Sequence, residues 1–298
     1  MSSAFDTFLQ QAWADHAGQP EAVAQRLRTQ TTTPQTTTPQ TPDQLVALVR
    51  LVVHSCGEHL GAFADGRSHL AALKGHPLAD AVVQSTLRVG IASLALSETG
   101  AADCGDFTLE EQIRCEAAAA AISLGRQQTE RAMALLRTAR DRLIALPDAA
   151  AAVHRPLGIA CHNMAWVLHD RGSARSAEET ATMLELAAGS KMHWAKAGTW
   201  LEVERGDYDL ARCNLAAGLL DPALHFASLC LAGCTQNNAP PYEVFFAHEA
   251  LALAQHARGE LADCARSIAA ATAAFAEMPP GDQEACRSTL AALQAMAR

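Results

Sequence analysis

Segments of helical length, rich in alanine and leucine, follow one another along almost the whole chain. Alanine and leucine favour helices, whereas the glycines and prolines between the segments end them, so each segment predicts one helix. No pattern typical of a strand competes with this prediction. The predicted helices span 3–17, 20–28, 43–60, 62–74, 79–98, 108–124, 128–146, 154–171, 174–188, 190–205, 207–219, 221–234, 242–257, 261–277 and 282–297. The glycines predicted to separate helices are Gly61, Gly75, Gly100, Gly172, Gly189, Gly206 and Gly259.

Composition agrees with an all-α fold. Hydrophobic residues make up 49% of the 298 residues, but aromatic residues only 5%. The β-branched and aromatic side chains that stabilise sheets are therefore scarce, and a chain of this length can bury a sizeable core. We expect helices packed on helices.

One segment has low complexity. Residues 30–43 contain the unit Thr-Thr-Thr-Pro-Gln twice in succession. This composition has no apolar surface to bury, and its prolines favour extended backbone. The sequence therefore predicts three parts: an N-terminal helical pair at 1–29, a linker at 30–43 and a helical domain at 44–298.

Charge and cysteine content limit the partners and the compartment. The net charge is −9, which is unfavourable for a protein that neutralises phosphates, so no nucleic-acid partner is expected. No apolar run is long enough to span a membrane, and the N-terminus lacks the features of a signal peptide. Nine cysteines, an odd number, without a Cys-x-x-Cys pair, indicate reduced thiols. We expect a cytoplasmic protein without a membrane partner, a metal site or a cofactor.

Small residues recur at fixed distances from the predicted turns. Gly172 is followed by Ala177 and Leu184, and Gly206 lies 34 residues after Gly172. Gly259 is followed by similar small and apolar residues. In this spacing the chain resembles the tetratricopeptide-repeat family, in an irregular form typical of uncharacterised bacterial proteins. The resemblance implies an irregular right-handed α-solenoid of helical hairpins, with the helix-pairing frame between 190 and 234 left open.

In such a solenoid the first helix of each hairpin lines a concave groove. We expect 154–171, 190–205 and 242–257 to be first helices, because each carries polar and aromatic residues along one face. The candidate groove residues are His162, Trp166, His169, His193, Lys196, Trp200, Glu204, Phe246, Glu249 and His256. The alternative is that the tryptophans pack in the core and the histidines are merely solvated.

Two functions from different classes remain. In the first, the groove binds a protein or peptide, with Trp166 and Trp200 as anchors. In the second, the protein is a small-molecule or metal-binding enzyme; its candidate ligands are His162, His193, Glu204, Glu249 and His256. No catalytic motif such as His-Glu-x-x-His supports the second, so no catalytic residue is assigned. Self-association is a third alternative, and the oligomeric state is left open.

Two short stretches are predicted to be structural. His54 and His59 flank Gly57 near a helix end; they could form a site there, but we expect their side chains to be solvated. Arg205-Gly206-Asp207 is predicted to be a helix end, a turn and the N-cap of the next helix.

Overall fold

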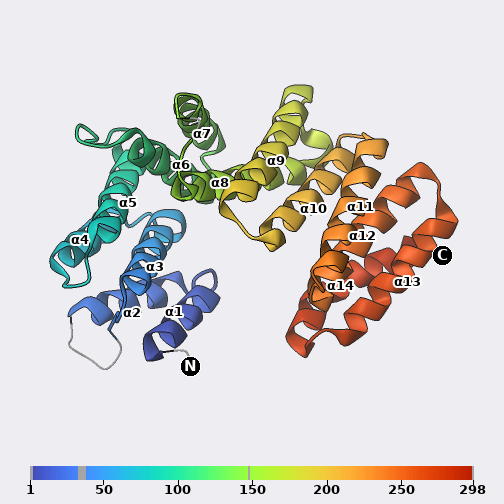
Figure 1. Cartoon of the computed structure of the whole chain (residues 1–298), viewed down its shortest axis with the longest axis horizontal. Coiled ribbons are helices and arrows are strands. Elements are labelled where there is room, and N and C mark those ends of the chain that lie inside the picture. The colour runs from blue at the N-terminus through green and yellow to red at the C-terminus, as the bar shows by residue number, and fades with distance from the viewer. Residues whose placement is uncertain (1–2, 33–37, 147, 297–298) are drawn as a thin grey trace. The chain divides into compact units, whose positions relative to one another are not determined.

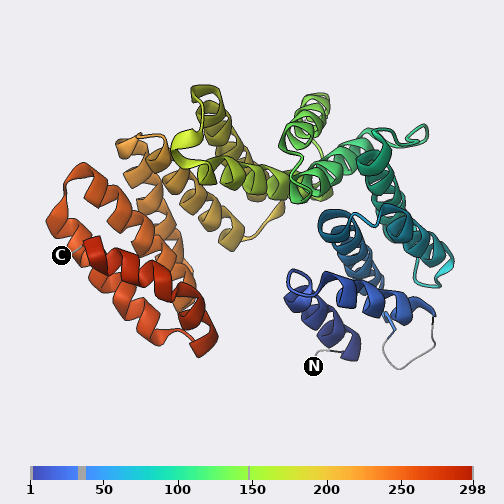
Figure 2. The same cartoon turned by 180° about the vertical axis from the view of Figure 1, so that it is seen from behind.

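The computed structural model describes residues 3–32, 38–146 and 148–296, and Figures 1 and 2 show it from opposite sides. Within these ranges the chain has 14 α-helices and no strand, which confirms the predicted all-α class. The α-helices are α1 (Ala4–Asp15), α2 (Pro20–Thr32), α3 (Pro42–Val53), α4 (Phe63–Ala72), α5 (Ala81–Thr99), α6 (Leu109–Gly125), α7 (Thr129–Ile144), α8 (Ala151–Asp170), α9 (Ala177–Ala197), α10 (Trp200–Ala216), α11 (Leu220–Gln236), α12 (Pro241–Arg258), α13 (Leu261–Glu277) and α14 (Pro280–Met296). A π-helical turn, η1 (His54–Leu60), continues α3, and short 3-10 turns span Leu73–Gly75 and Gly172–Ala174.

The chain forms two compact units, unit 1 (Met1–Ala160) and unit 2 (Cys161–Arg298). Helix α8 crosses from one unit to the other. Each helix in the described ranges is too short or too polar to cross a membrane.

The N-terminal helices of unit 1 share a large apolar core. Phe5 and Leu9 of α1, Leu27 of α2 and Leu48 of α3 are all buried in it. A polar tie supplements this packing, because the Gln44 amide at the start of α3 donates to Ser3 and Asp6, which cap α1. The two N-terminal helices therefore share a core with α3. The predicted linker at 30–43 stays a prediction, since residues 33–37 lie outside the described part of the chain.

Unit 2 is built from neighbouring helices that pack in chain order. Helices α9 to α14 each contact the next, and α12 also contacts both α10 and α14. Phe245 of α12 is fully buried in an apolar cluster with Ile268 of α13 and Leu293 of α14. Helix α10 contacts α12, and side chains of α8 bond to α10, so these three helices share one surface, as the contacts below show.

The helix boundaries between 174 and 219 differ from the prediction. The predicted breaks at Gly189 and Gly206 are wrong, because both residues lie inside helices. A Cβ on Gly206 would lie 3.1 Å from the Lys191 Cα, so this glycine permits a close helix crossing. The true break is at Gly198 and Thr199, where Thr199 forms a capping box with Glu202.

This correction has two consequences. The predicted helix 190–205 does not exist as such: its first half ends α9 and its second half begins α10. Arg205-Gly206-Asp207 is not a turn but lies within α10. Elsewhere the predicted helices agree with the structure to within four residues at each end, except that the helix predicted at 43–60 is α3 up to Val53 and the π-helical turn η1 from His54 to Leu60.

Candidate functional site

A ridge of polar and aromatic side chains runs along one face of α10. Its members are Arg205, Tyr208, Asp209 and Arg212, spaced three, four and seven residues from the first. This spacing places all four side chains on the same side of the helix. Each of them contacts α8 or α12, so α10 is the central helix of the site.

Asp209 connects α10 to α8. The Trp166 indole Nε1 donates to Asp209 Oδ1 at 2.8 Å, and His162 Nδ1 lies 2.6 Å from Asp209 Oδ2. Because an ionised carboxylate only accepts hydrogen bonds, His162 Nδ1 is the donor. The Asp209 side chain is buried, whereas the His162 side chain is 41% exposed. The buried Asp209 carboxylate therefore orients the side chains of both His162 and Trp166.

Arg212 and Glu249 connect α10 to α12. Arg212 Nη1 lies 2.7 Å from Glu249 Oε1 and donates to the Tyr208 hydroxyl at 2.8 Å. Burial raises the pKa of Glu249 above its ordinary value, while Arg212 and Tyr208 partly oppose that shift. The Arg212 guanidinium also lies 5.7 Å from the ring centroids of both Trp166 and Tyr208, a cation–π arrangement.

Aromatic rings form a continuous row across the three helices. Trp166 stacks on Tyr208 with centroids 6.1 Å apart, and Tyr208 meets Phe246 edge-on at 5.7 Å. Tyr242 extends the row, with its ring 5.0 Å from Phe246. All four residues are partly buried, so each ring packs against its neighbours while the residue keeps some contact with solvent.

The basic side chains of this site are more exposed than the carboxylates that they contact. Arg205 of α10 pairs with Glu243 of α12; their side chains are 53% and 7% exposed. The same asymmetry holds for His162 over Asp209 and, at 21% against 5%, for Arg212 over Glu249. The hydrogen bonds that Arg205 donates to Glu243 raise the pKa of Arg205 and so keep it charged. The surface thus presents aromatic rings flanked by cations; we call it the α8–α10–α12 face.

The structure brings five of the ten predicted site residues to this face or its edge. His162, Trp166, Phe246 and Glu249 have been described, and the His169 ring lies 4.7 Å from Trp166.

The other five predicted residues lie elsewhere. His193 is buried on α9, Lys196 is exposed near the end of that helix, and His256 is exposed near the end of α12. Trp200 is exposed at the start of α10. Buried Glu204 accepts hydrogen bonds from the Cys230 and Cys234 thiols at 2.7 and 3.3 Å, and burial raises its pKa.

The sequence analysis missed the residues that organise the face. Tyr208, Asp209 and Arg212 share helical spacing with Arg205, but the predicted break at Gly206 divided this stripe. Helical periodicity that continues across Gly206 is the sequence signal that identifies this stripe of residues. Glu243 was missed because an acidic residue in the first turn of a helix is ordinarily explained by the helix dipole.

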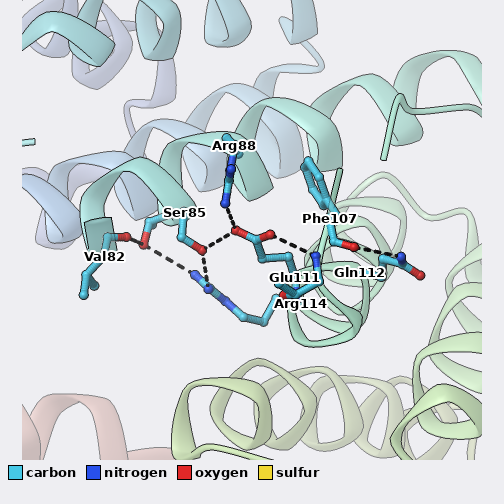
Figure 3. Close-up of polar contacts among 9 residues, drawn as sticks. Val82, Ser85, Arg88, Phe107, Glu111, Gln112 and Arg114 are labelled. Carbon is cyan, nitrogen blue, oxygen red and sulfur yellow. Dashed lines mark hydrogen bonds and ion pairs between the residues drawn. The ribbon is translucent and has the colours of Figure 1, made fainter. Parts of the chain in front are cut away.

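A second polar network, in unit 1, has a structural explanation. Figure 3 shows Glu111 at the start of α6, where its carboxylate accepts from the Ser85 hydroxyl at 2.7 Å and pairs with Arg88. The other Glu111 oxygen accepts from the Thr108 backbone N–H, completing a capping box. Arg114 donates to the same Ser85 hydroxyl at 3.1 Å. These contacts cap α6 and join it to α5, so they account for the buried carboxylate without a ligand.

The five residues considered for a metal site do not come together. Within the described residues, one group of metal-binding side chains has its ligand atoms close enough to share an ion, and it is a different set: His16, His54 and His59.

In comparisons with known proteins, no protein-family model and no curated protein matches the chain.

Proposed function

We propose that the chain is a protein- or peptide-binding adaptor whose unit 2 holds its partner on the α8–α10–α12 face. The observation that carries the proposal is the row of Trp166, Tyr208, Phe246 and Tyr242, partly exposed and flanked by cations. Aromatic side chains and arginine are the residues that most often dominate binding interfaces.

The pairing of the cations defines the class of partner. Arg205 and Arg212 are each held over a buried carboxylate, so the positions of these cations are fixed before a partner arrives. A partner that places a carboxylate over Arg205 gains a charge-assisted hydrogen bond from a preorganised donor. We therefore propose a partner segment with acidic residues beside apolar or aromatic ones.

Nucleic acid fits this face less well. Unit 2 as a whole contains more acidic than basic residues. Nucleic acid presents a long row of phosphates that requires a surplus of positive charge over a wide surface, whereas one acidic side chain of a peptide needs a single donor such as Arg205.

The proposal includes the architecture. Helices α8, α10 and α12 are the first helices of hairpins completed by α9, α11 and α13, and their alignment supports tetratricopeptide-like repeats stacked as a right-handed solenoid. The cytoplasmic location is also part of the proposal; it is supported by nine free cysteines, eight of them buried.

A peptide array tests the proposal. The full chain is applied to matched sets of short synthetic peptides that are acidic or basic, each with and without aromatic residues. We expect the acidic aromatic set to be retained, and we expect Trp166→Ala and Arg205→Ala each to weaken binding by tenfold or more.

The control for this experiment is Trp200→Ala. Trp200 is an exposed residue of α10, and its indole makes none of the contacts described for the face. Equal retention of basic peptides, or a Trp166→Ala chain that binds as well as the unchanged one, would contradict the proposal.

A further inference from the structure

Three histidines of unit 1 meet although they are distant in the sequence. His16 follows the end of α1, whereas His54 and His59 lie in η1. One ring nitrogen from each lies within 4.8 Å of the others, and the Nε2 atoms of His54 and His59 are 3.1 Å apart. All three residues are half-buried, so the expectation that His54 and His59 are simply solvated is wrong. We call this group the histidine cluster.

The π-helical turn is what places two of these rings together. Residues five apart in an α-helix point about 140° away from each other, so an α-helical turn would separate His54 from His59. A π-helix closes its hydrogen bonds between residues five apart, which returns His59 to the side of His54. Such turns are frequent at functional sites.

Close packing holds this turn in place. A Cβ on Gly57 would lie 2.9 Å from Ile122 and 3.1 Å from Leu94, so α5 and α6 press directly on η1. At the end of α6, Gly125 approaches Glu58 so closely that a Cβ there would lie 2.8 Å from the Glu58 Cβ. The backbone that carries His54 and His59 is therefore preorganised.

Hydrogen bonds orient two of the imidazoles. Glu58 Oε1 lies 2.7 Å from His54 Nδ1, and the backbone carbonyl of Trp13 contacts His16 Nδ1. Both partners are acceptors, so Nδ1 carries the proton in each ring and Nε2 presents its lone pair. A carboxylate or carbonyl behind the ring is the arrangement that supports metal-binding histidines in known metal sites.

We propose that the histidine cluster is a binding site for a divalent transition-metal ion of the zinc type, with His16, His54 and His59 as its three protein ligands and one position open to water or to an exogenous ligand. Imidazole is a preferred ligand for zinc, copper and nickel. A tetrahedral ion bound at 2.0–2.1 Å separates its nitrogen ligands by about 3.3 Å, so the third ring needs to approach by no more than about 1.5 Å.

The site lies in unit 1 and shares no residue with the α8–α10–α12 face, so the metal proposal stands or falls independently of the adaptor function. A bound ion is expected to connect the end of α1 to η1, because His16 follows α1 whereas His54 and His59 lie in η1. Trp13 packs against two of the ligands, with ring centroids 5.2 Å from His16 and 5.1 Å from His54.

Metal titration of the full chain tests this proposal. The purified protein is stripped with chelator and titrated with Zn²⁺ against a chromophoric competitor, and with Co²⁺ followed by its visible absorption. We expect one equivalent of Zn²⁺ at micromolar affinity or tighter, and a Co²⁺ spectrum typical of tetrahedral nitrogen coordination. His54→Gln and His59→Gln are expected to abolish stoichiometric binding, and Glu58→Gln to weaken it by about 10- to 100-fold.

Two further variants make the result decisive. His225→Gln removes an exposed histidine of unit 2 and is expected to leave binding unchanged. His16→Gln alters a half-buried side chain just beyond the end of α1, so the helix itself is expected to persist, and circular dichroism verifies this. The proposal is overturned if the unchanged chain binds no equivalent of Zn²⁺, or if the folded His16→Gln chain binds it with undiminished affinity.

Discussion

The histidine cluster of unit 1 and the α8–α10–α12 face of unit 2 are preorganised by different means. In unit 1, close contacts at glycines and a π-helical turn fix the backbone, and the backbone determines where the His54 and His59 side chains lie. In unit 2, regular helices are joined through buried carboxylates, each holding an exposed cation. A substitution that disturbs backbone packing should therefore damage the histidine cluster. Replacing one buried carboxylate oxygen should damage the α8–α10–α12 face.

His69 of unit 1 and two buried carboxyl groups of unit 2 respond to acid in opposite directions. Burial, with Arg28 as a second cause, lowers the pKa of His69 to about 4. Burial raises the pKa of Glu204 and of Glu249. Acid therefore destabilises the folded chain at His69 and relieves the cost of burying a charge at Glu204 and Glu249.

The largest expected effect comes from His69. Above pH 6.5 its imidazole is neutral in both the folded and the unfolded chain. Between pH 6.5 and about 4 the unfolded chain binds a proton that the folded chain does not, so stability is lost as the pH falls. The loss reaches about 3 kcal/mol near pH 4. Denaturant unfolding at pH 7 and pH 4.5 should show a smaller loss for His69→Leu than for the unchanged chain.

The control variant for this measurement is His225→Leu, which removes an exposed imidazole. This variant should show the same pH dependence of the free energy of unfolding as the unchanged chain. An unchanged pH dependence in His69→Leu would show that His69 is not a main source of acid sensitivity.

Gly57→Ala tests the role of backbone packing in unit 1. The added methyl group meets the buried Ile122 and Leu94 side chains, and overpacking of this kind costs about 1–3 kcal/mol. We also expect weaker Zn²⁺ binding, because η1 must shift, whereas peptide binding on the α8–α10–α12 face should persist. Thermal unfolding and the Zn²⁺ titration measure both effects.

Gly75→Ala is the control, since a Cβ at Gly75 meets nothing within 4 Å. If Gly57→Ala retained full Zn²⁺ affinity, the π-helical turn would not be what organises the histidine cluster.

Asp209→Asn gives the smallest effect on stability and acts on unit 2. The amide keeps the size of the side chain but replaces one carboxylate acceptor of His162 or Trp166 with a donor. We expect a loss of about 1 kcal/mol, because His162 is well exposed and water screens its interaction. Peptide binding should weaken while Zn²⁺ binding is unaffected. Glu178→Gln, which neutralises an exposed acid in the first turn of α9, is the control for charge.

The succession of helices was predictable because local chemistry determines it: alanine and leucine between glycine and proline breaks. The errors arose at Gly189 and Gly206, which both lie inside helices; at Gly206 the glycine permits a close helix crossing and does not end the helix. Sequence alone does not distinguish these two uses, because the difference lies in a neighbouring helix that is distant along the chain.

The sites were predictable only in part. Trp166 and Glu249 were selected from helical periodicity and do lie on the α8–α10–α12 face. Asp209 was missed because the wrong break at Gly206 interrupted that periodicity. The histidine cluster was beyond such reasoning, since α-helical geometry separates His54 from His59 and the tertiary fold alone brings His16 beside them.

The position of Trp13 has a practical consequence for spectroscopy. The other three tryptophans, Trp166, Trp194 and Trp200, all belong to unit 2, so unit 1 contains a single indole, and that indole touches the histidine cluster. With the other three replaced by phenylalanine, the emission of the chain would come from one fluorophore beside the proposed ion. A paramagnetic ion at that position quenches such emission at short range, so occupancy of the cluster could be followed by light in a protein that carries no added label.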